Sequence, residues 1–289
     1  MADLSQEVFT QRADLAESDD GWFLGQNITV KTLAGDDSIL GTRDMGEGLE
    51  NTGRIQTERG DDTIFGETTL TTNGNGIYNA FGGSINGGPG DDRIHGRSIQ
   101  SGLNNDANSL IDGGPGNDLI LGEAETAILV GSNARIRGGG GRDSIIGDGL
   151  IVGISNRGRL EGGSGNDTIT GSGSVAAIDN AGEILAGSGN DSVDGLIGGF
   201  SGTGITRMGS GRDRLVGFGS GQFFGDAGRD TLLLPEGVYT VDAGQGTISN
   251  GTTTMQVFSF ERIGGSVGGL FTFASGTLSV DASGNGSFA

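Results

Sequence analysis

Apolar and polar positions recur in a fixed order along most of the chain. Each repeat has a Gly-rich segment, then an Asp, then an apolar residue two positions later and usually a Gly four positions later, as in EGGSGNDTITG (161–171). Aligned on this Asp, the nine copies follow one another at intervals of 25, 30, 26, 25, 24, 24, 22 and 17 residues. Within each copy, turn-forming residues give way to β-branched or other apolar ones, which predicts a turn followed by a strand.

Two apolar columns keep this register. The column two residues after the Asp has no exception: Ile39, Ile64, Ile94, Ile120, Ile145, Ile169, Val193, Leu215 and Leu232. The column seven residues before the Asp is broken only by Thr206, and otherwise holds Val30, Ile55, Ile85, Ile111, Ile136, Leu160, Ile184 and Phe223. Gly-rich disorder would not keep such columns, so the pattern indicates a repeat architecture.

We therefore predict an all-β fold, a parallel β-solenoid of the β-roll or β-helix type with about nine coils of ~24 residues. Each coil should run through the Asp-bearing turn, a strand, a Gly bend, a second strand, a Gly-containing corner and a short third strand. A second apolar segment, such as Leu150-Ile151-Val152, forms the second strand, and an Asn precedes the corner in several copies. The longest interval predicts a corner loop over residues 69–83, and the 17-residue interval predicts a solenoid that narrows at its end.

The flanks lack the repeat and are interpreted as caps over exposed strand edges. We divide the chain into an N-terminal cap (1–27) with a short helix among Leu4, Val8 and Phe9, the solenoid (28–234), and a C-terminal β cap (235–289). Residues 247–252 are expected to form a hairpin turn. The C-terminal cap is also the candidate type I secretion signal.

Composition narrows the classes of function. The chain has 289 residues, 62 of them Gly, with a net charge of −20 from 37 acidic and 17 basic groups, one His and no Cys. Disulfides, thiolate metal sites and cysteine nucleophiles are excluded. The acidic balance argues against nucleic acid or an anionic membrane as a partner. The first twenty residues carry acids where a cleaved signal carries bases, and no segment approaches a membrane span.

Stacked in register, the nine Asp side chains would form a row of carboxylates about 5 Å apart. Two such charges repel by about 3 kcal/mol at an effective dielectric of 20. Carboxylates together with the carbonyls of Gly-rich turns make an all-oxygen shell, which suits Ca²⁺. The alternative is that each Asp only caps its turn by accepting a backbone N–H. Nine copies in register favour the cation.

The motif GGxGxDxU, in which U is apolar, is intact at residues 87–94, 113–120, 138–145 and 162–169. Over residues 32–234 the chain resembles the haemolysin-type calcium-binding repeat of RTX proteins. The resemblance implies Ca²⁺ held between equivalent turns of adjacent coils, and export through a type I exporter that reads the C-terminal region. Family β-rolls run nonapeptides in tandem, two to an 18-residue turn, whereas this motif recurs about every 24 residues, so we expect a single calcium-binding edge.

The candidate metal ligands are the motif Asp side chains and the Gly backbone of the same turns, for up to about eight ions. They are Asp37, Asp62, Asp92, Asp118, Asp143, Asp167, Asp191, Asp213 and Asp230, with Gly88, Gly90, Gly114, Gly116, Gly139, Gly141, Gly163, Gly165, Gly187 and Gly189. The third to sixth copies, where the motif is intact, should bind best. Arg142, Arg212 and Arg229 precede the Asp where other copies have Asp or Asn.

These features predict a secreted, extracellular or cell-surface calcium-binding protein with a structural or adhesive role, whose solenoid folds on binding Ca²⁺. The alternative is a calcium-dependent carbohydrate-binding or carbohydrate-active β-helix protein, with extracellular polysaccharide or the cell surface as partner. We expect no enzyme, because Lys31, His95, Tyr78 and Tyr239 are scattered and His95 should face solvent. Ice binding would need a Thr array in every coil, and such an array occurs in one coil only, at Thr68, Thr69, Thr71 and Thr72.

Overall fold

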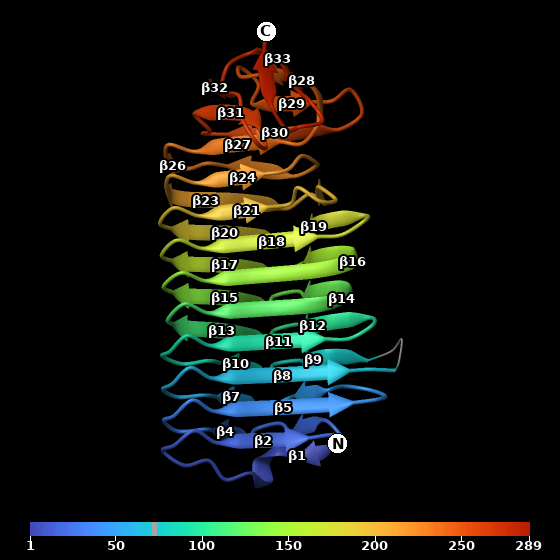
Figure 1. Ribbon diagram of the computed structural model, residues 1–289, viewed down its shortest axis with the longest axis vertical. Helices are drawn as coiled ribbons and strands as arrows, with labels where there is room; N and C mark the ends of the chain where they lie inside the picture. The colour runs from blue at the N-terminus through green and yellow to red at the C-terminus, as the bar shows by residue number, and fades with distance from the viewer. Residues whose placement is uncertain (71–73) are drawn as a thin grey trace.

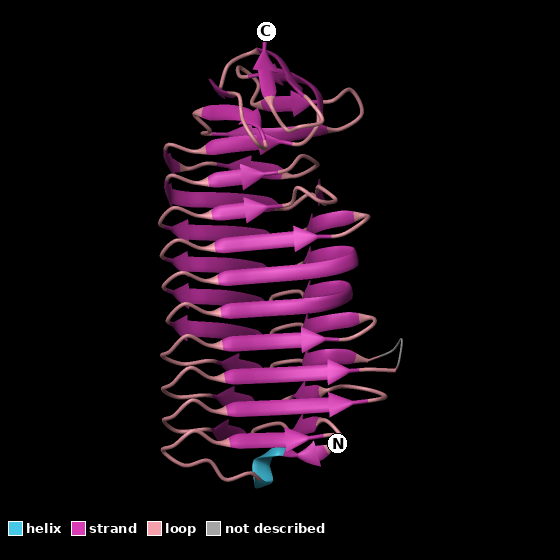
Figure 2. Cartoon of the chain, viewed as in Figure 1, coloured by secondary structure: helices cyan, strands magenta, loops and turns pink. Residues whose placement is uncertain are grey.

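The computed structural model describes residues 1–70 and 74–289. The chain winds into a parallel β-solenoid of about 8 turns, which confirms the predicted fold class (Figure 1). Nearly every ordered segment is a strand, and the helical element of the described residues is a single 3₁₀ turn, η1 (Leu4–Gln6), near the N-terminus (Figure 2). No helix in this part of the chain is long and apolar enough to span a membrane.

All the repeat coils except the 17-residue one contribute strands to three faces, in the order that the sequence predicts. The first face, which follows the Asp, stacks β2 (Leu15–Ser18), β5 (Ser38–Arg43), β8 (Thr63–Thr68), β11 (Arg93–Arg97), the first part of β14 (Leu119–Val130) and of β16 (Ser144–Asn156), β18 (Thr168–Ser172), β21 (Ser192–Asp194), β24 (Arg214–Val216), β27 (Thr231–Leu234) and β31 (Arg262–Gly265). All of these pairings are parallel.

The other two faces are built in the same way. The second face holds β1 (Ala2–Asp3), β3 (Trp22–Leu24), β6 (Leu49–Asn51), β9 (Asn75–Asn79), β12 (Ser101–Asn105), the ends of β14 and β16, β19 (Ala176–Asn180) and β22 (Phe200–Ser201). The third face holds β4 (Thr29–Lys31), β7 (Arg54–Gln56), β10 (Ser84–Asn86), β13 (Leu110–Pro115), β15 (Arg135–Gly140), β17 (Arg159–Ser164), β20 (Glu183–Ser188), β23 (Ile205–Gly211), β25 (Gln222–Phe224) and β26 (Ala227–Gly228).

The core is a set of apolar columns that run along the solenoid axis. The two columns predicted from the sequence lie on the first and third faces, where Ile145 pairs with Ile169 and Ile136 with Leu160. A third column lines the second face, with Leu49, Ile77, Leu103, Ile128, Ile154, Ile178 and Phe200 in register. Every residue of these columns is buried, so each coil covers the apolar surface of the next.

Buried asparagines stack where the second face meets the third. The Asn51 side-chain amide donates to Asn79 Oδ1 at 2.7 Å, and the Asn79 amide donates to Asn105 Oδ1 at 2.7 Å. Val130 interrupts this row, which resumes with Asn156 donating to Asn180 at 2.9 Å. The asparagine amides donate hydrogen bonds to one another and accept them from one another, and Asn79, Asn105 and Asn156 also donate to backbone carbonyls at this corner.

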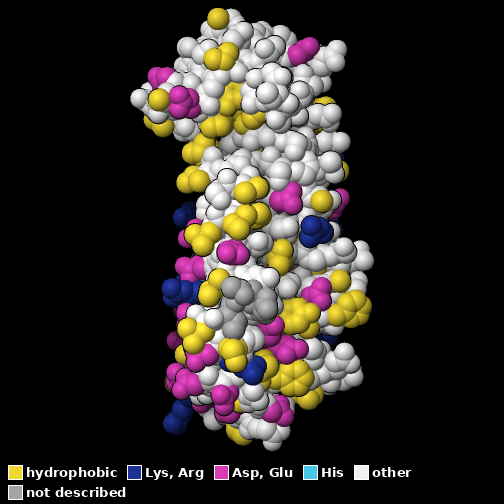
Figure 3. Space-filling model, turned by 90° about the vertical axis from the view of Figure 1, so that its right-hand side faces the viewer, with side chains coloured by type: hydrophobic (Ala, Val, Ile, Leu, Met, Phe, Trp, Pro, Cys, Tyr) yellow, Lys and Arg dark blue, Asp and Glu magenta, His cyan; other side chains and the backbone are white. Residues whose placement is uncertain are grey.

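At the bend between the first and second faces, β14 and β16 run on as single strands, where the prediction had two strands separated by a Gly bend. The segment Leu150-Ile151-Val152 lies in a strand as predicted, within β16, but Leu150 is 73% exposed and the residue that enters the core is Ile154. Val175 of the next coil is 70% exposed for the same reason, because these residues lie on the bend itself. Figure 3 shows apolar side chains along this side of the molecule, interrupted by acidic ones.

The two ends close the stack in different ways. At the N-terminus β2, β3 and β4 pair with the first repeat coil, so a coil without the Gly-rich motif extends the sheets. At the C-terminus β28 (Gly237–Asp242), β29 (Thr247–Ser249), β32 (Leu270–Thr272), β33 (Gly276–Val280) and β34 (Gly286–Phe288) pair antiparallel. The predicted hairpin is confirmed, because β29 pairs antiparallel with β30 (Thr254–Phe258), which in turn pairs parallel with β25.

Two interval lengths have structural counterparts. The 17-residue coil has β24 and β25 but no strand on the second face, where a bridge from Phe200 to Gly219 takes its place, so the solenoid narrows as predicted. The loop predicted over residues 69–83 is wrong in part, because β9 occupies Asn75–Asn79. Residues 71–73 of that loop, including Thr71 and Thr72, lie outside the described residues.

The Gly-rich turns lie between the third face and the first face of the next coil. All ten glycines predicted to serve the metal site have φ between 91° and 149°, a range that L side chains rarely adopt. A Cβ on Gly116 would lie 1.8 Å from the carbonyl oxygen of Gly90 in the preceding coil. Glycine is therefore required twice over, for its backbone conformation and for the close approach of adjacent turns.

Neighbouring glycines of one turn allow a test of this requirement. Gly141 has φ of 133°, and an added Cβ would lie 2.0 Å from the Gly116 oxygen. Gly140 lacks a positive φ, and its Cβ would meet only Ser164 Oγ at 3.3 Å. In urea unfolding with saturating calcium, Gly141→Ala should destabilise the protein by about 2 kcal/mol or more, whereas Gly140→Ala should stay within about 1 kcal/mol. Equal effects would contradict this assignment.

Candidate metal-binding corner

The nine motif aspartates line one corner of the solenoid, which we call the aspartate corner. They are Asp37, Asp62, Asp92, Asp118, Asp143, Asp167, Asp191, Asp213 and Asp230, and each is at most 3% exposed. Each of the first eight backbone N–H groups donates to Oδ1 of the aspartate in the next coil, over 2.7–2.9 Å. Asp capping of a backbone amide, the alternative weighed from the sequence, is thus present as well, but it links coils rather than closing a turn.

The ladder continues one step beyond each end of the predicted row. The Asp14 N–H donates to Asp37 Oδ1 at 2.7 Å, and the Asp230 N–H donates to Glu261 Oε2 at 2.6 Å. The repeat motif does not include either position, because neither has the Gly-rich lead. The signal that could have found them is the apolar residue two positions later, Ala16 and Ile263, which pairs in register with the first-face column.

The second oxygen of each aspartate has no partner. Oδ2 is buried without a hydrogen bond in all nine: Asp37, Asp62, Asp92, Asp118, Asp143, Asp167, Asp191, Asp213 and Asp230. A buried polar atom without a partner costs about 1–3 kcal/mol, and more if it is charged. Nine such atoms in one row are far more than the few buried polar groups that an ordinary folded protein leaves without a hydrogen bond. The row therefore indicates that a ligand binds here.

Beside the orphaned oxygens of five coils lies a glycine, at Gly87, Gly113, Gly138, Gly162 and Gly225, whereas Thr32, Thr57, Ala186 and Met208 take this position in the other four. A Cβ on Gly113 would lie 2.5 Å from Asp118 Oδ2 and 2.5 Å from the carbonyl oxygen of Gly138 in the next coil. The same arrangement recurs at Gly87 beside Asp92. The first Gly of the motif therefore leaves room for the carboxylate, and a carbonyl from the following coil lies close to it.

Burial raises the pKa of every ladder aspartate above its ordinary 3.8. It raises the pKa of Asp92 to about 8 and the pKa values of Asp118 and Asp213 to about 7. The backbone N–H of the preceding coil opposes this rise in pKa, and neighbouring carboxylates add to it. Without a cation, the folded ladder therefore favours the protonated, uncharged form.

The donor set fits calcium in its chemistry. It consists of oxygen atoms alone, as Ca²⁺ prefers, and no described backbone N–H donates to the carbonyls of Gly60, Gly90, Gly116, Gly141, Gly165 or Gly189. Within the described residues, no three acidic or histidine side chains converge on one point. Any calcium shell here must therefore combine one carboxylate oxygen per coil with backbone carbonyls and water.

A second row of side chains lies outside the first, at the residue before each aspartate. Asp36, Asp61, Asp91 and Asn117 each accept the backbone N–H of the same position in the next coil, over 2.7–3.0 Å. Asn166 and Asn190 do the same. The row stops at Arg142 and Arg212, whose side chains have no acceptor oxygen.

His95 does not face solvent as predicted from the sequence, since it is only 8% exposed. The Phe65 ring lies 5.0 Å from its ring centre, and Glu123 Oε2 lies 3.0 Å from its Nε2. Burial lowers the pKa of His95, although the hydrogen bond to Glu123 opposes this. Outward-facing side chains of neighbouring strands cover His95. The alternation of inward and outward positions along one strand shows only that His95 points outward, and not that its neighbours cover it.

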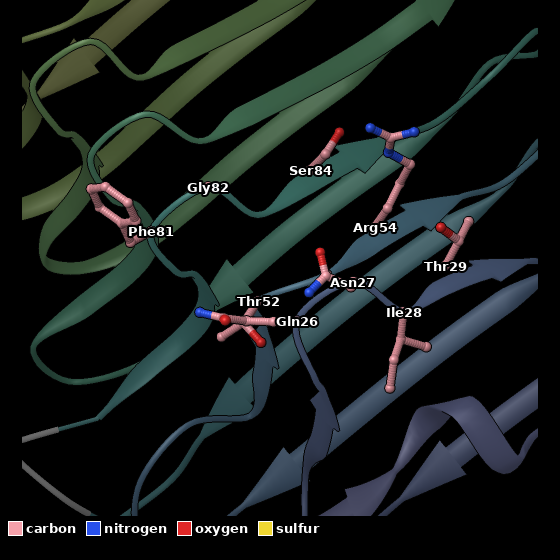
Figure 4. A pocket seen from close by; sticks show the side chains of 10 residues that line it. Gln26, Asn27, Ile28, Thr29, Thr52, Arg54, Phe81, Gly82 and Ser84 are labelled. Carbon is pink, nitrogen blue, oxygen red and sulfur yellow. The ribbon is translucent and has the colours of Figure 1, made fainter.

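A notch lies at the corner between the second and third faces. Thr52 and Gly53 form a two-residue corner, whereas the corners of the coils before and after it have four residues, 25–28 and 80–83. The shorter corner leaves a hollow of about 490 Å³. Figure 4 shows Phe81 on the corner loop and Arg54 beside Ser84 on adjacent strands; the lining is completed by Gln26, Asn27, Ile28, Thr29 and Gly82.

Fold and corner together define a calcium-binding repeat protein of the β-solenoid class. The family model of the RTX calcium-binding nonapeptide repeat matches four copies, at residues 48–68, 81–98, 105–126 and 153–174. Each match contains one ladder aspartate: Asp62, Asp92, Asp118 and Asp167. The chain thus carries RTX calcium-binding repeats, as its sequence motif indicated. No match is found among the curated proteins.

The ladder predicts an unusual pH dependence for the calcium-free protein. The pKa values of the ladder aspartates are higher in the folded protein than the ordinary 3.8, so their protonation adds to the free energy of unfolding. This contribution is complete below pH 3.8 and is lost as the pH rises through the pKa values of the folded state, which reach about 8 at Asp92. In EDTA, the urea midpoint should therefore fall as the pH rises from about 5 to about 6.5, below the pH at which the calcium-free chain is expected to unfold. A midpoint that is constant or rises with pH over this range would contradict the buried, orphaned ladder.

Proposed function

We propose that the aspartate corner binds a row of Ca²⁺ ions between adjacent coils and that calcium is required for the solenoid to fold at neutral pH. The observation that carries the proposal is the row of nine buried Oδ2 atoms without a hydrogen-bond partner. The RTX repeats support calcium as the ligand. The proposed ligands are the nine ladder aspartates and backbone carbonyls of the Gly-rich turns.

The energetics favour a folding switch. Ionised and without a cation, the ladder combines desolvation with repulsion between neighbouring carboxylates, both of which oppose folding. Calcium at 100 times its dissociation constant would stabilise each site by about 2.7 kcal/mol. With nine aspartates there are eight intervals between coils, so up to about eight ions would act together.

We further propose that this switch serves a secreted protein that is structural or adhesive at a cell surface or in an extracellular matrix. Calcium-poor cytosol would keep the ladder charged and the chain unfolded, in a form that a type I exporter could thread. Calcium outside the cell would then trigger folding. The net charge of −20 supports solubility of such a rod outside the cell.

A binding role is favoured over a catalytic one. His95 is paired with Glu123 and is nearly covered, and it does not line the notch. The second candidate function, calcium-dependent carbohydrate binding, is favoured by the notch itself. Phe81, 63% exposed, offers an aromatic face, while Gln26, Asn27 and Arg54 offer exposed hydrogen-bonding groups.

Circular dichroism tests the switch. In EDTA at pH 7.5 the far-UV spectrum should show coil, and millimolar Ca²⁺ but not equal Mg²⁺ should restore β structure. Asp143→Asn, which removes a buried ladder charge, should raise the calcium midpoint severalfold. Asp148→Asn, an exposed acid of the same coil, should leave it unchanged. A fully folded protein in EDTA, or equal shifts in the two variants, would refute the proposal.

A glycan array in calcium tests the second candidate. If the notch binds sugar, Phe81→Ala should weaken any glycan signal about fivefold or more, because it removes the aromatic face. Val175→Ala, another exposed apolar residue on a different corner, is the control and should not change the signal. A signal that survives Phe81→Ala would exclude the notch as the sugar site.

A further inference from the structure

Four arginines line one groove near the C-terminal end of the solenoid. The groove has a volume of about 350 Å³ and lies beside β24, β27 and β31. Its walls are formed by Arg212, Arg214, Arg229 and Arg262, with Asp213, Thr231, Leu233 and Leu270. We call it the arginine groove. Four of the chain's 16 arginines therefore meet in one hollow of a protein whose net charge is −20.

The solenoid itself aligns these side chains. Arg214, Thr231 and Arg262 occupy one register position on three successive first-face strands. Arg212 and Arg229 each precede a ladder aspartate in consecutive coils. With strands about 4.8 Å apart, the positive charges extend over about 10 Å along the axis. A single small anion could not contact all of this length.

No acidic partner accounts for the cluster. Within the described residues, ion pairs within 4.0 Å involve other arginines, such as Arg159 and Arg207, and none of the four in the groove. The one acid in the lining, Asp213, is 2% exposed, and its Oδ1 accepts the Asp191 N–H. Among the described residues, no ion pair within 4.0 Å therefore offsets the repulsion among the four guanidinium groups.

Arginine at the turn position also gives up a structural bond. In earlier coils the Asp or Asn before the ladder aspartate accepts the N–H of the same position in the next coil, as Asn190 accepts from Arg212 at 2.9 Å. Arg212 cannot continue this row, and the Arg229 N–H donates instead to the Gly211 carbonyl at 3.1 Å. Replacing Asp or Asn by Arg at this position therefore favours a binding role for Arg212 and Arg229 over a structural one.

We propose that the arginine groove binds the carboxylate groups of an acidic polysaccharide. Guanidinium pairs with carboxylates through two parallel hydrogen bonds, and arginines on successive coils match anionic groups repeated along a chain. Leu270, which is 45% exposed, supplies an apolar wall for a sugar ring face, and Leu233, which is 7% exposed, lies at the base of the groove. Nucleic acid is disfavoured, because its much denser charge, one per about 1.7 Å, would be repelled by the acidic remainder of the surface.

The groove lies away from the notch and needs only the folded solenoid. Its test is therefore run in calcium, with circular dichroism confirming the fold of every variant. If a folded protein does not bind the ligand, only this inference fails. If the protein does not fold with calcium, the proposed function fails.

The experiment titrates tri-galacturonate and its neutral methyl ester into the protein by calorimetry. Arg212→Gln with Arg229→Gln should weaken binding of the acidic trimer about tenfold or more, since each lost guanidinium removes a charge-assisted pair. Arg142→Gln with Arg157→Gln is the matched control: Arg142 has the same turn position three coils earlier, and both side chains are exposed. The control should stay within about twofold.

Five outcomes would overturn the inference, the first four of which concern the trimer, the control variant and DNA. These four are no measurable binding of the acidic trimer, equal binding of the methyl ester, an equal loss in the control variant, and tighter binding of single-stranded DNA. Inorganic phosphate or sulfate that binds as tightly as the trimer would also overturn it, because it would mark a site for one small anion. Binding of the acidic trimer alone, lost in the groove variant, would support it.

Discussion

Burial of one carboxylate per coil at a single corner is the constraint on which the rest of the structure depends. Each ladder aspartate gives one oxygen to the backbone of the preceding coil and leaves the other without a partner. The first oxygen sets the register between coils, since a shifted coil would lose its bond. The second is buried without a hydrogen bond, which is the basis for the proposed dependence of the stack on a cation. One side chain therefore links the geometry of the repeat to its proposed control by calcium.

The glycines follow from the same constraint. The turn must bring backbone close enough for the aspartate N–H of one coil to reach the carboxylate of the next, and positive φ at Gly114 and Gly116 provides this path. A side chain at either position would collide with a carbonyl of the preceding coil. The high glycine content is thus the price of stacking turns without side chains between them. The apolar columns then supply ordinary hydrophobic stabilisation.

Much of this structure could be predicted from the sequence, because each coil repeats the same residue types at the same spacing. The Ile and Asp columns gave the three-face coil, the register and the aspartate corner. The repeat period does not show which way an individual side chain points. It could not show that Leu150 faces solvent on a bend, that Phe65 covers His95, or which carboxylate oxygen is left unpaired. Asp14 and Glu261 were missed because the search required the Gly-rich lead, whereas the ladder needs only an acid followed by an apolar residue.

The most direct test of the account is a crystal structure grown in millimolar calcium, with anomalous scattering measured to locate the ions. We expect a row of peaks along the aspartate corner, between adjacent coils, each within about 2.3–2.6 Å of a ladder Oδ2 atom. Absence of peaks at this corner, or peaks confined to the exposed outer acids such as Asp36 and Asp61, would contradict it.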